Sequence, residues 1–157
     1  MTIPHLGDAK WNVELGTFLN KENLRVIEWK YFRGSDFFIF SNPLKSFQMM
    51  GPTLTSEFSY LRGNFIHNFN GNIFGKIPLI NRLNLQLSAG ASTLLIPGEN
   101  LNYFETFIGI SRPFKLWGDL VKFGIYGCSS VNSLTGSTFE LKIGASSFNP
   151  FTKKWDY

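Results

Sequence analysis

The sequence predicts an all-β protein built as an antiparallel transmembrane β-barrel. Between residues 84 and 92, Leu85, Leu87, Ala89 and Ala91 share one parity, and the residues between them are polar or glycine. A two-residue period places alternate side chains on opposite faces of a strand, so this stretch has one apolar and one polar face. The same period returns in three later stretches, at 104–110, 121–125 and 139–145. Repeated two-faced strands indicate an antiparallel meander or barrel.

Aromatic density and the absence of a long apolar run favour strands that meet a membrane. Aromatic residues make up 17% of the chain, which calls for a core, an interface or a membrane girdle. No apolar run approaches the roughly 20 residues of a spanning helix, whereas a tilted spanning strand needs only about 9 to 11. The apolar face points inward in a soluble lipocalin-like barrel and outward at lipid in an outer-membrane barrel. The period alone does not separate these two interpretations.

In chain order the pattern predicts about seven strands. The first three are expected at 10–19, 24–33 and 53–70, the last with a bulge near Arg62 and Gly63. Prolines, glycines and asparagines predict a loop and turns, at 41–52, 97–100, 113–118 and 132–136. Seven strands fall just short of the eight in the smallest barrels. We therefore expect residues 1–157 to form one barrel domain that is the C-terminal part of a longer chain.

The C-terminus favours the membrane interpretation. Phe151, Trp155 and Tyr157 continue the apolar parity of the last strand. Aromatic side chains at strand ends form the interfacial girdle of outer-membrane barrels. These three residues are the predicted girdle.

Charged residues gather on the polar faces of the later strands. Glu105, Lys122, Tyr126, Glu140 and Lys142 all lie on the parity opposite the apolar residues. Charges sealed inside an apolar core are costly, so this face must meet water or form a paired network. We predict that these five residues face the lumen. The glycines of the same parity would leave room there for a plug or for aromatic side chains; they are Gly90, Gly109, Gly124 and Gly144.

The segment from Gly71 to Leu83 has no two-residue period and is apolar. Such a connector fits an interface better than a solvated turn, and the hypothesis is that Ile77, Leu79 and Ile80 dock another component of the cell envelope. Nucleic acid is not expected as a partner, because the net charge of +4 is dispersed and the aromatic residues lie on the apolar faces. Anionic lipid headgroups account for the positive excess equally well.

No catalytic, metal or cofactor site is predicted. The two histidines, His5 and His67, are far apart in the sequence, and neither has a nearby cluster of ligating residues. The single cysteine, Cys128, falls on a polar face and is expected to pack rather than react. For a lipid-modifying enzyme, the least poor candidates are His67 and Glu105.

Five short strings resemble a known family; they lie at 4–7, 32–36, 40–44, 67–71 and 75–81. They resemble the C-terminal region of large Bacteroidota outer-membrane proteins that carry an N-terminal carboxypeptidase-regulatory-like domain and whose function is unknown. The resemblance covers nearly the whole chain, and the strings HNFNG and GKIPLIN are its most specific parts. It implies a signal peptide and a small periplasmic domain upstream, followed by a barrel whose last strands this chain supplies. It implies no catalytic residues.

Together these observations predict a non-enzymatic protein of the Gram-negative outer membrane, with outer-membrane lipid as its first partner. A transport or envelope-assembly role is expected. The alternatives are a soluble lipocalin-like carrier of a hydrophobic ligand and, less well supported, the lipid-modifying enzyme.

Overall fold

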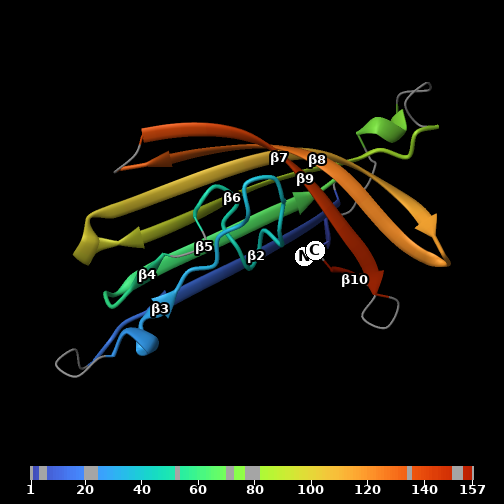
Figure 1. Cartoon of the computed structure of the whole chain (residues 1–157). Helices are drawn as coiled ribbons and strands as arrows, with labels where there is room; N and C mark the ends of the chain where they lie inside the picture. Colours follow the sequence, from blue (N-terminus) through green and yellow to red (C-terminus); the bar gives the residue numbers. More distant parts are fainter. Residues whose placement is uncertain are drawn as a thin grey trace.

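The computed structural model describes residues 2–3, 7–19, 25–51, 54–69, 73–76, 82–133, 136–149 and 154–156. Its main feature is an eight-stranded antiparallel sheet in which strand follows strand in chain order, β1-β2-β5-β6-β7-β8-β9-β10 (Figure 1). The strands are β1 (Thr2–Ile3), β2 (Gly7–Gly16), β5 (Tyr60–Asn68), β6 (Gln86–Ile96), β7 (Leu101–Leu116), β8 (Asp119–Asn132), β9 (Gly136–Asn149) and β10 (Lys154–Asp156). The all-β antiparallel prediction is confirmed.

The sheet is open in the part of the chain that the structure describes. β1 and β10 are its two edges, and no described residue of one pairs with the other. The ladders between the long strands are continuous, so side-chain parity is carried from strand to strand. Ile110 of β7, for example, lies opposite Ile125 of β8, which lies opposite Ile143 of β9. Each face of the sheet is therefore one chemical surface rather than a mixture of two.

The first half of the chain departs from the predicted strands. Of the predicted strand at 24–33, the described residues 25–33 contain only the short strand β3 (Lys30–Tyr31), which pairs with β4 (Thr55–Ser56) and follows a 3-10 turn, η1 (Val26–Glu28). The alternation there does not extend into a long strand, because Phe32 turns away and becomes fully buried. The predicted bulge near Arg62 is also wrong, since β5 keeps an unbroken register with both of its neighbours.

Two further 3-10 turns connect the long strands: η2 (Phe74–Lys76) precedes β6, and η3 (Pro97–Glu99) joins β6 to β7. At the end of η3, Asn100 has a φ of 53°, the left-handed conformation that asparagine tolerates better than most residues. None of the described helices is long and apolar enough to cross a membrane.

The two faces of the sheet have an inverted polarity. On one face the residues are serines, glycines, charged residues and aromatics, together with the aliphatic residues Ile66, Leu94, Ile96 and Leu101, and many of them are buried; Glu105 and Lys142 are each 1% exposed and Lys122 is 4% exposed. On the opposite face large apolar side chains meet the surroundings; Ile108 is 58% exposed and Ile125 is 64% exposed. A soluble domain buries its apolar face and exposes its polar one. This sheet instead exposes a continuous apolar face and buries charged side chains beside the aromatic and aliphatic residues of its inner face.

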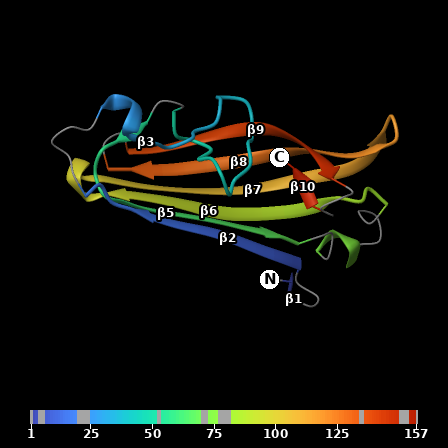
Figure 2. The same cartoon turned by 90° about the horizontal axis from the view of Figure 1, so that it is seen from below.

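A long excursion of the chain between β3 and β4 buries the polar face. Residues 32–51, which we name the inner segment, fold back from one end of the sheet and lie across its curved inner side (Figures 1 and 2). The β3–β4 pair and a hydrogen bond of 2.9 Å from Phe32 N to Leu54 O close the base of this excursion. The sheet and the inner segment together form the core.

Three phenylalanines of the inner segment fix it to the sheet. Phe32 meets Tyr60 edge to face at 4.9 Å between ring centroids, and Phe47 meets Tyr103 in the same way at 5.5 Å. Phe40 stacks on Tyr126 at 3.7 Å with the rings 3° from parallel. All three phenylalanines are at most 2% exposed. Each buried ring contributes on the order of 3 kcal/mol, and the edge-to-face geometry adds to it.

The glycines of the inner parity make room for these rings, as the sequence predicts. A Cβ on Gly109 would lie 2.0 Å from the ring of Tyr126, and one on Gly90 would lie 2.4 Å from the ring of Phe107. A Cβ on Gly144 would lie 3.1 Å from the Cβ of Phe40. The space left by absent side chains is thus filled by Tyr126, by Phe107 and by the inner segment.

Candidate functional site

The candidate site is the inner polar face of the sheet together with the inner segment that covers it. Its centre is the carboxylate of Glu105 on β7. The side chain of Glu105 lies on the inner face of the sheet and contacts the backbone of residues 48 and 49. The backbone N–H of Gln48 donates to both oxygens, at 2.8 Å to Oε1 and 2.9 Å to Oε2. Met49 N–H donates to Oε2 at 3.0 Å, and the hydroxyl of Tyr103 donates to the same oxygen at 2.7 Å.

Every group around Glu105 is therefore a donor, which fits an ionised carboxylate that only accepts hydrogen bonds. A buried charge is costly unless it is saturated with such partners. The Glu105 carboxylate thus binds the inner segment by accepting hydrogen bonds from its backbone. The arrangement fixes residues 48 and 49 to β7.

A second attachment joins the start of the inner segment to β9. Lys142 Nζ donates to the backbone oxygen of Asp36 at 2.7 Å and lies 3.4 Å from Oε2 of Glu140. Beside it, Phe40 N–H donates to Ile143 O at 2.9 Å, and Ile143 N–H donates to Phe38 O at 2.8 Å. Residues 38–40 therefore cover part of the free edge of β9, which would otherwise present unpaired backbone groups.

A third polar cluster lies under the base of the excursion. Glu14 of β2 accepts from Lys30 and, at 2.7 Å from its Oε1, from the hydroxyl of Tyr60. The hydrogen bond from the ammonium to this carboxylate raises the pKa of Lys30 above its usual value. Arg62 Nη1 lies 3.8 Å from Glu14 Oε2, and Arg62 Nε donates to Asn64 Oδ1 at 2.8 Å. The guanidinium also lies over the ring of Phe47, 5.1 Å from its centroid.

The inner face is not completely filled. A cavity of about 490 Å³ lies between residues 49–51 and 54 on one side and strands β7 to β9 on the other, with Glu99, Ser130 and Glu140 among its lining. A second cavity of about 250 Å³ shares Met49, Met50, Gly51 and Glu140 with the first. Mixed polar and apolar space of this kind accommodates water or a small polar solute.

Comparison with known proteins places this architecture in a family. Residues 1–110 match the family described as "Family of unknown function (DUF5686) C-terminal domain". The chain belongs to this family. No curated protein and no solved structure matches the chain. The matched range contains all five strings that carry the resemblance, and it ends within β7, short of the nearly complete coverage that the sequence predicts.

In this member of the DUF5686 C-terminal family, the five residues predicted to face a lumen lie on the inner face. Four of them, Glu105, Lys122, Tyr126 and Lys142, are buried, and Glu140 is partly exposed at the two cavities. The structure brings Glu140 and Lys142 together. Glu105 and Tyr126 contact different parts of the inner segment, at Gln48 and Phe40 respectively. Their facing a lumen stays a prediction.

Two other predicted sets lie outside the described residues. The docking residues Ile77, Leu79 and Ile80 fall in an undescribed stretch, as do Phe151 and Tyr157 of the predicted girdle. Trp155 belongs to β10, and only its backbone is described. Aromatic residues do gather at the β7–β8 turn, where Phe114 stacks on Phe123 at 5.1 Å and Trp117 is 96% exposed.

The candidate enzyme residues are not brought together. His67 lies near the end of β5 on the outer parity, with its ring 4.4 Å from that of Phe69, whereas Glu105 is on the inner face of β7. Cys128 is fully buried on the inner face, where it packs near Phe40 and Tyr126. The described residues contain no group of three or more histidine, cysteine or carboxylate side chains that would hold a metal ion.

Sequence reasoning missed the inner segment as part of the site. It placed a loop at 41–52 but assigned no role to Gln48 or Met49, whose backbone N–H groups are the partners of Glu105. One signal was available, because Phe32, Phe40 and Phe47 recur at intervals of seven or eight, and the last of them lies in the loop predicted at 41–52. Large apolar side chains in an irregular segment indicate that the segment is buried.

Proposed function

We propose that this chain is part of an integral β-barrel of the Gram-negative outer membrane and that it serves transport or envelope assembly without chemistry of its own. The observation that carries the proposal is the inverted polarity of the sheet. Its outer face presents Ile108, Ile125, Phe139, Leu141 and Ile143, all more than half exposed. In an outer-membrane barrel the apolar parity meets lipid and the polar parity lines the interior.

The family membership supports the same proposal through the resemblance set out above. On this proposal the whole protein is a Bacteroidota envelope protein in which a carboxypeptidase-regulatory-like domain precedes the barrel. The cavities beside the inner segment fit a transport role, because a segment attached only by non-covalent contacts can give way to a solute. The apolar connector with Ile77, Leu79 and Ile80 is the proposed contact to a second envelope protein. If all three became polar and every co-purifying partner remained, that contact would be excluded.

A soluble carrier is less well supported. Such a protein needs its apolar face turned toward an interior ligand and its polar face toward water. Here the interior side carries Glu105, Lys122 and Lys142, and the inner segment occupies it. The arrangement also gives no support to lipid-modifying chemistry by His67 and Glu105, because they lie on opposite faces of the sheet.

The test is a lysine scan of the outer face in phospholipid vesicles. Ile108→Lys places a charge midway along β7, which costs about 2–4 kcal/mol if the position lies at the bilayer midplane. Ser137→Lys is the matched control on the same outer parity at the end of β9, where the cost is about 0–1 kcal/mol. The free energy of unfolding of each variant, measured by denaturant titration, gives the cost of each lysine. Equal stability of the two variants, or greater solubility of Ile108→Lys without detergent, would refute the proposal, because an exposed Ile→Lys change is harmless in water.

A further inference from the structure

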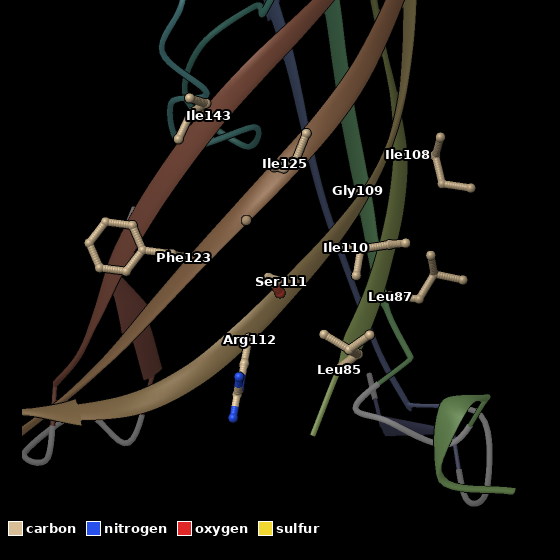
Figure 3. A pocket seen from close by; sticks show the side chains of 11 residues that line it. Leu85, Leu87, Ile108, Gly109, Ile110, Ser111, Arg112, Phe123, Ile125 and Ile143 are labelled. Carbon is tan, nitrogen blue, oxygen red and sulfur yellow. The ribbon is translucent and has the colours of Figure 1, made fainter. Parts of the chain in front are cut away.

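The outer face is not a uniform apolar surface. It contains a hollow of about 790 Å³ that spans β6 to β9, which we name the outer hollow (Figure 3). One cross-strand row forms its centre and consists of Leu87, Ile110, Ile125 and Ile143. Gly109 and Gly124 lie on the inner parity and line the outer hollow with their backbone atoms, which form its floor there. A volume of this size is within the range of about 300–1,000 Å³ that holds small ligands.

One charged residue lines the outer hollow. Arg112 follows Ile108 and Ile110 on the outer parity of β7, and Figure 3 shows its guanidinium beyond the apolar side chains, toward the β7–β8 turn. Arg112 is exposed and forms no ion pair with any described residue. Phe123 lies directly opposite Arg112 on β8 and stacks on Phe114, and the exposed Trp117 lies beyond them at the turn. A cation and several aromatic side chains at the end of an apolar face are typical of the level where the hydrocarbon of a bilayer meets its headgroups.

We propose that the outer hollow is a binding site for one anionic phospholipid, with an acyl chain against Ile108, Ile110 and Ile125 and the phosphate on Arg112. The inference rests on the proposed function, because it requires the outer face to lie in a bilayer. Guanidinium binds phosphate through two parallel hydrogen bonds, and Arg112 has no competing carboxylate among the described residues. The cross-strand row and Ile108 beside it supply a fixed apolar surface for an acyl chain. Charge and shape together select a lipid with a negative headgroup over a zwitterionic one.

The experiment is native mass spectrometry of the whole protein in detergent micelles containing equal amounts of phosphatidylglycerol and phosphatidylcholine. The wild-type chain should retain phosphatidylglycerol in preference. Arg112→Gln should reduce that preference about fivefold, the factor that one headgroup-level cation supplies. Ile110→Trp places a bulky ring at the centre of the outer hollow and should weaken lipid binding while Arg112 is still present. Lys115→Gln removes an exposed cation from the same strand outside the hollow and should leave the preference unchanged.

The outcomes separate this site from the proposed function. A protein that needs detergent but binds both lipids equally, or keeps its preference in Arg112→Gln, overturns the lipid site alone. Loss of the preference in Lys115→Gln to the same degree also overturns it, because the effect would then come from net charge. A protein that stays soluble without detergent overturns both the lipid site and the barrel.

Discussion

Replacing Glu105 by glutamine tests whether the inner segment is attached to the sheet through this carboxylate. Glutamine keeps the size of the side chain but exchanges one acceptor oxygen for an amide NH₂. In either orientation, at least one of the donors from Gln48, Met49 and Tyr103 then faces another donor. A hydrogen bond to a charged group is worth about 1.5–3 kcal/mol, and the remaining bonds to a neutral oxygen weaken. We expect Glu105→Gln to reduce the docking free energy of the inner segment by about 2–4 kcal/mol.

Amide hydrogen exchange measures this loss directly. The amides of Gln48 and Met49 are protected only while the inner segment is docked, so their protection should fall by about 30- to 700-fold. The matched control is Glu99→Gln, because Glu99 borders the larger cavity and forms no ion pair with the described residues. That variant should change stability by less than about 0.5 kcal/mol. Unchanged protection of residues 48 and 49 in Glu105→Gln would show that contacts other than this carboxylate hold the segment.

Three further changes test the packing and the base of the inner segment. Gly109→Ala puts a Cβ 2.0 Å from the ring of Tyr126 and should lower the free energy of unfolding by about 1–3 kcal/mol, measured by denaturant titration. Gly127→Ala, whose Cβ has its nearest contact at 3.5 Å, should be neutral or stabilising. The reverse order of stability would contradict the packing. Phe40→Ala should cost about 3–5 kcal/mol and expose residues 33–51 to limited proteolysis, and an unchanged cleavage pattern would exclude its role as an anchor. The pKa of Lys30 in the folded protein is raised above its usual value of 10.5, so its contribution to stability is complete below that pH and is lost as the pH rises through the folded pKa. The Lys30→Met variant should lack this loss of stability at alkaline pH. Identical pH profiles of unfolding for the two proteins would refute the assignment.

The second half of the fold could be predicted from the sequence because its information is local. Residues 104–110, 121–125 and 139–145 fall within β7, β8 and β9, and residues 86–92 of the first stretch fall within β6, which begins two residues later than the alternation. Neighbouring strands in the chain are also neighbours in the sheet, so alternation along each strand was sufficient to define both faces. Only the ends differ: β7 continues through Pro113 to Leu116, where a turn was expected, because Pro113 still pairs with Lys122 in the long β7–β8 ribbon.

The inner segment could not be predicted in the same way because its contacts are distant in sequence. Gln48 and Glu105 are 57 residues apart, and Asp36 and Lys142 are 106 apart. No local period marks such pairs. The segment 24–33 has a strand-like alternation, yet the gain from burying Phe32 against Tyr60 outweighs strand propensity there. Charged residues on one face of a strand indicate a polar surface, but only the tertiary structure identifies the segment that covers this surface.

The inner glycines connect the two proposed roles of the sheet. On the inner face, Gly109 and Gly124 allow Tyr126 to lie against the backbone, where it stacks on Phe40 of the inner segment. On the outer face, the backbone of the same two glycines is the floor of the outer hollow. A side chain at either position would push Tyr126 and the strand backbone apart, which moves that floor together with the isoleucine rows beside it. Docking of the inner segment and binding of the proposed lipid therefore depend on the same short stretches of backbone in β7 and β8. A substitution at Gly124 should weaken both, while one at Arg112 should weaken lipid binding alone.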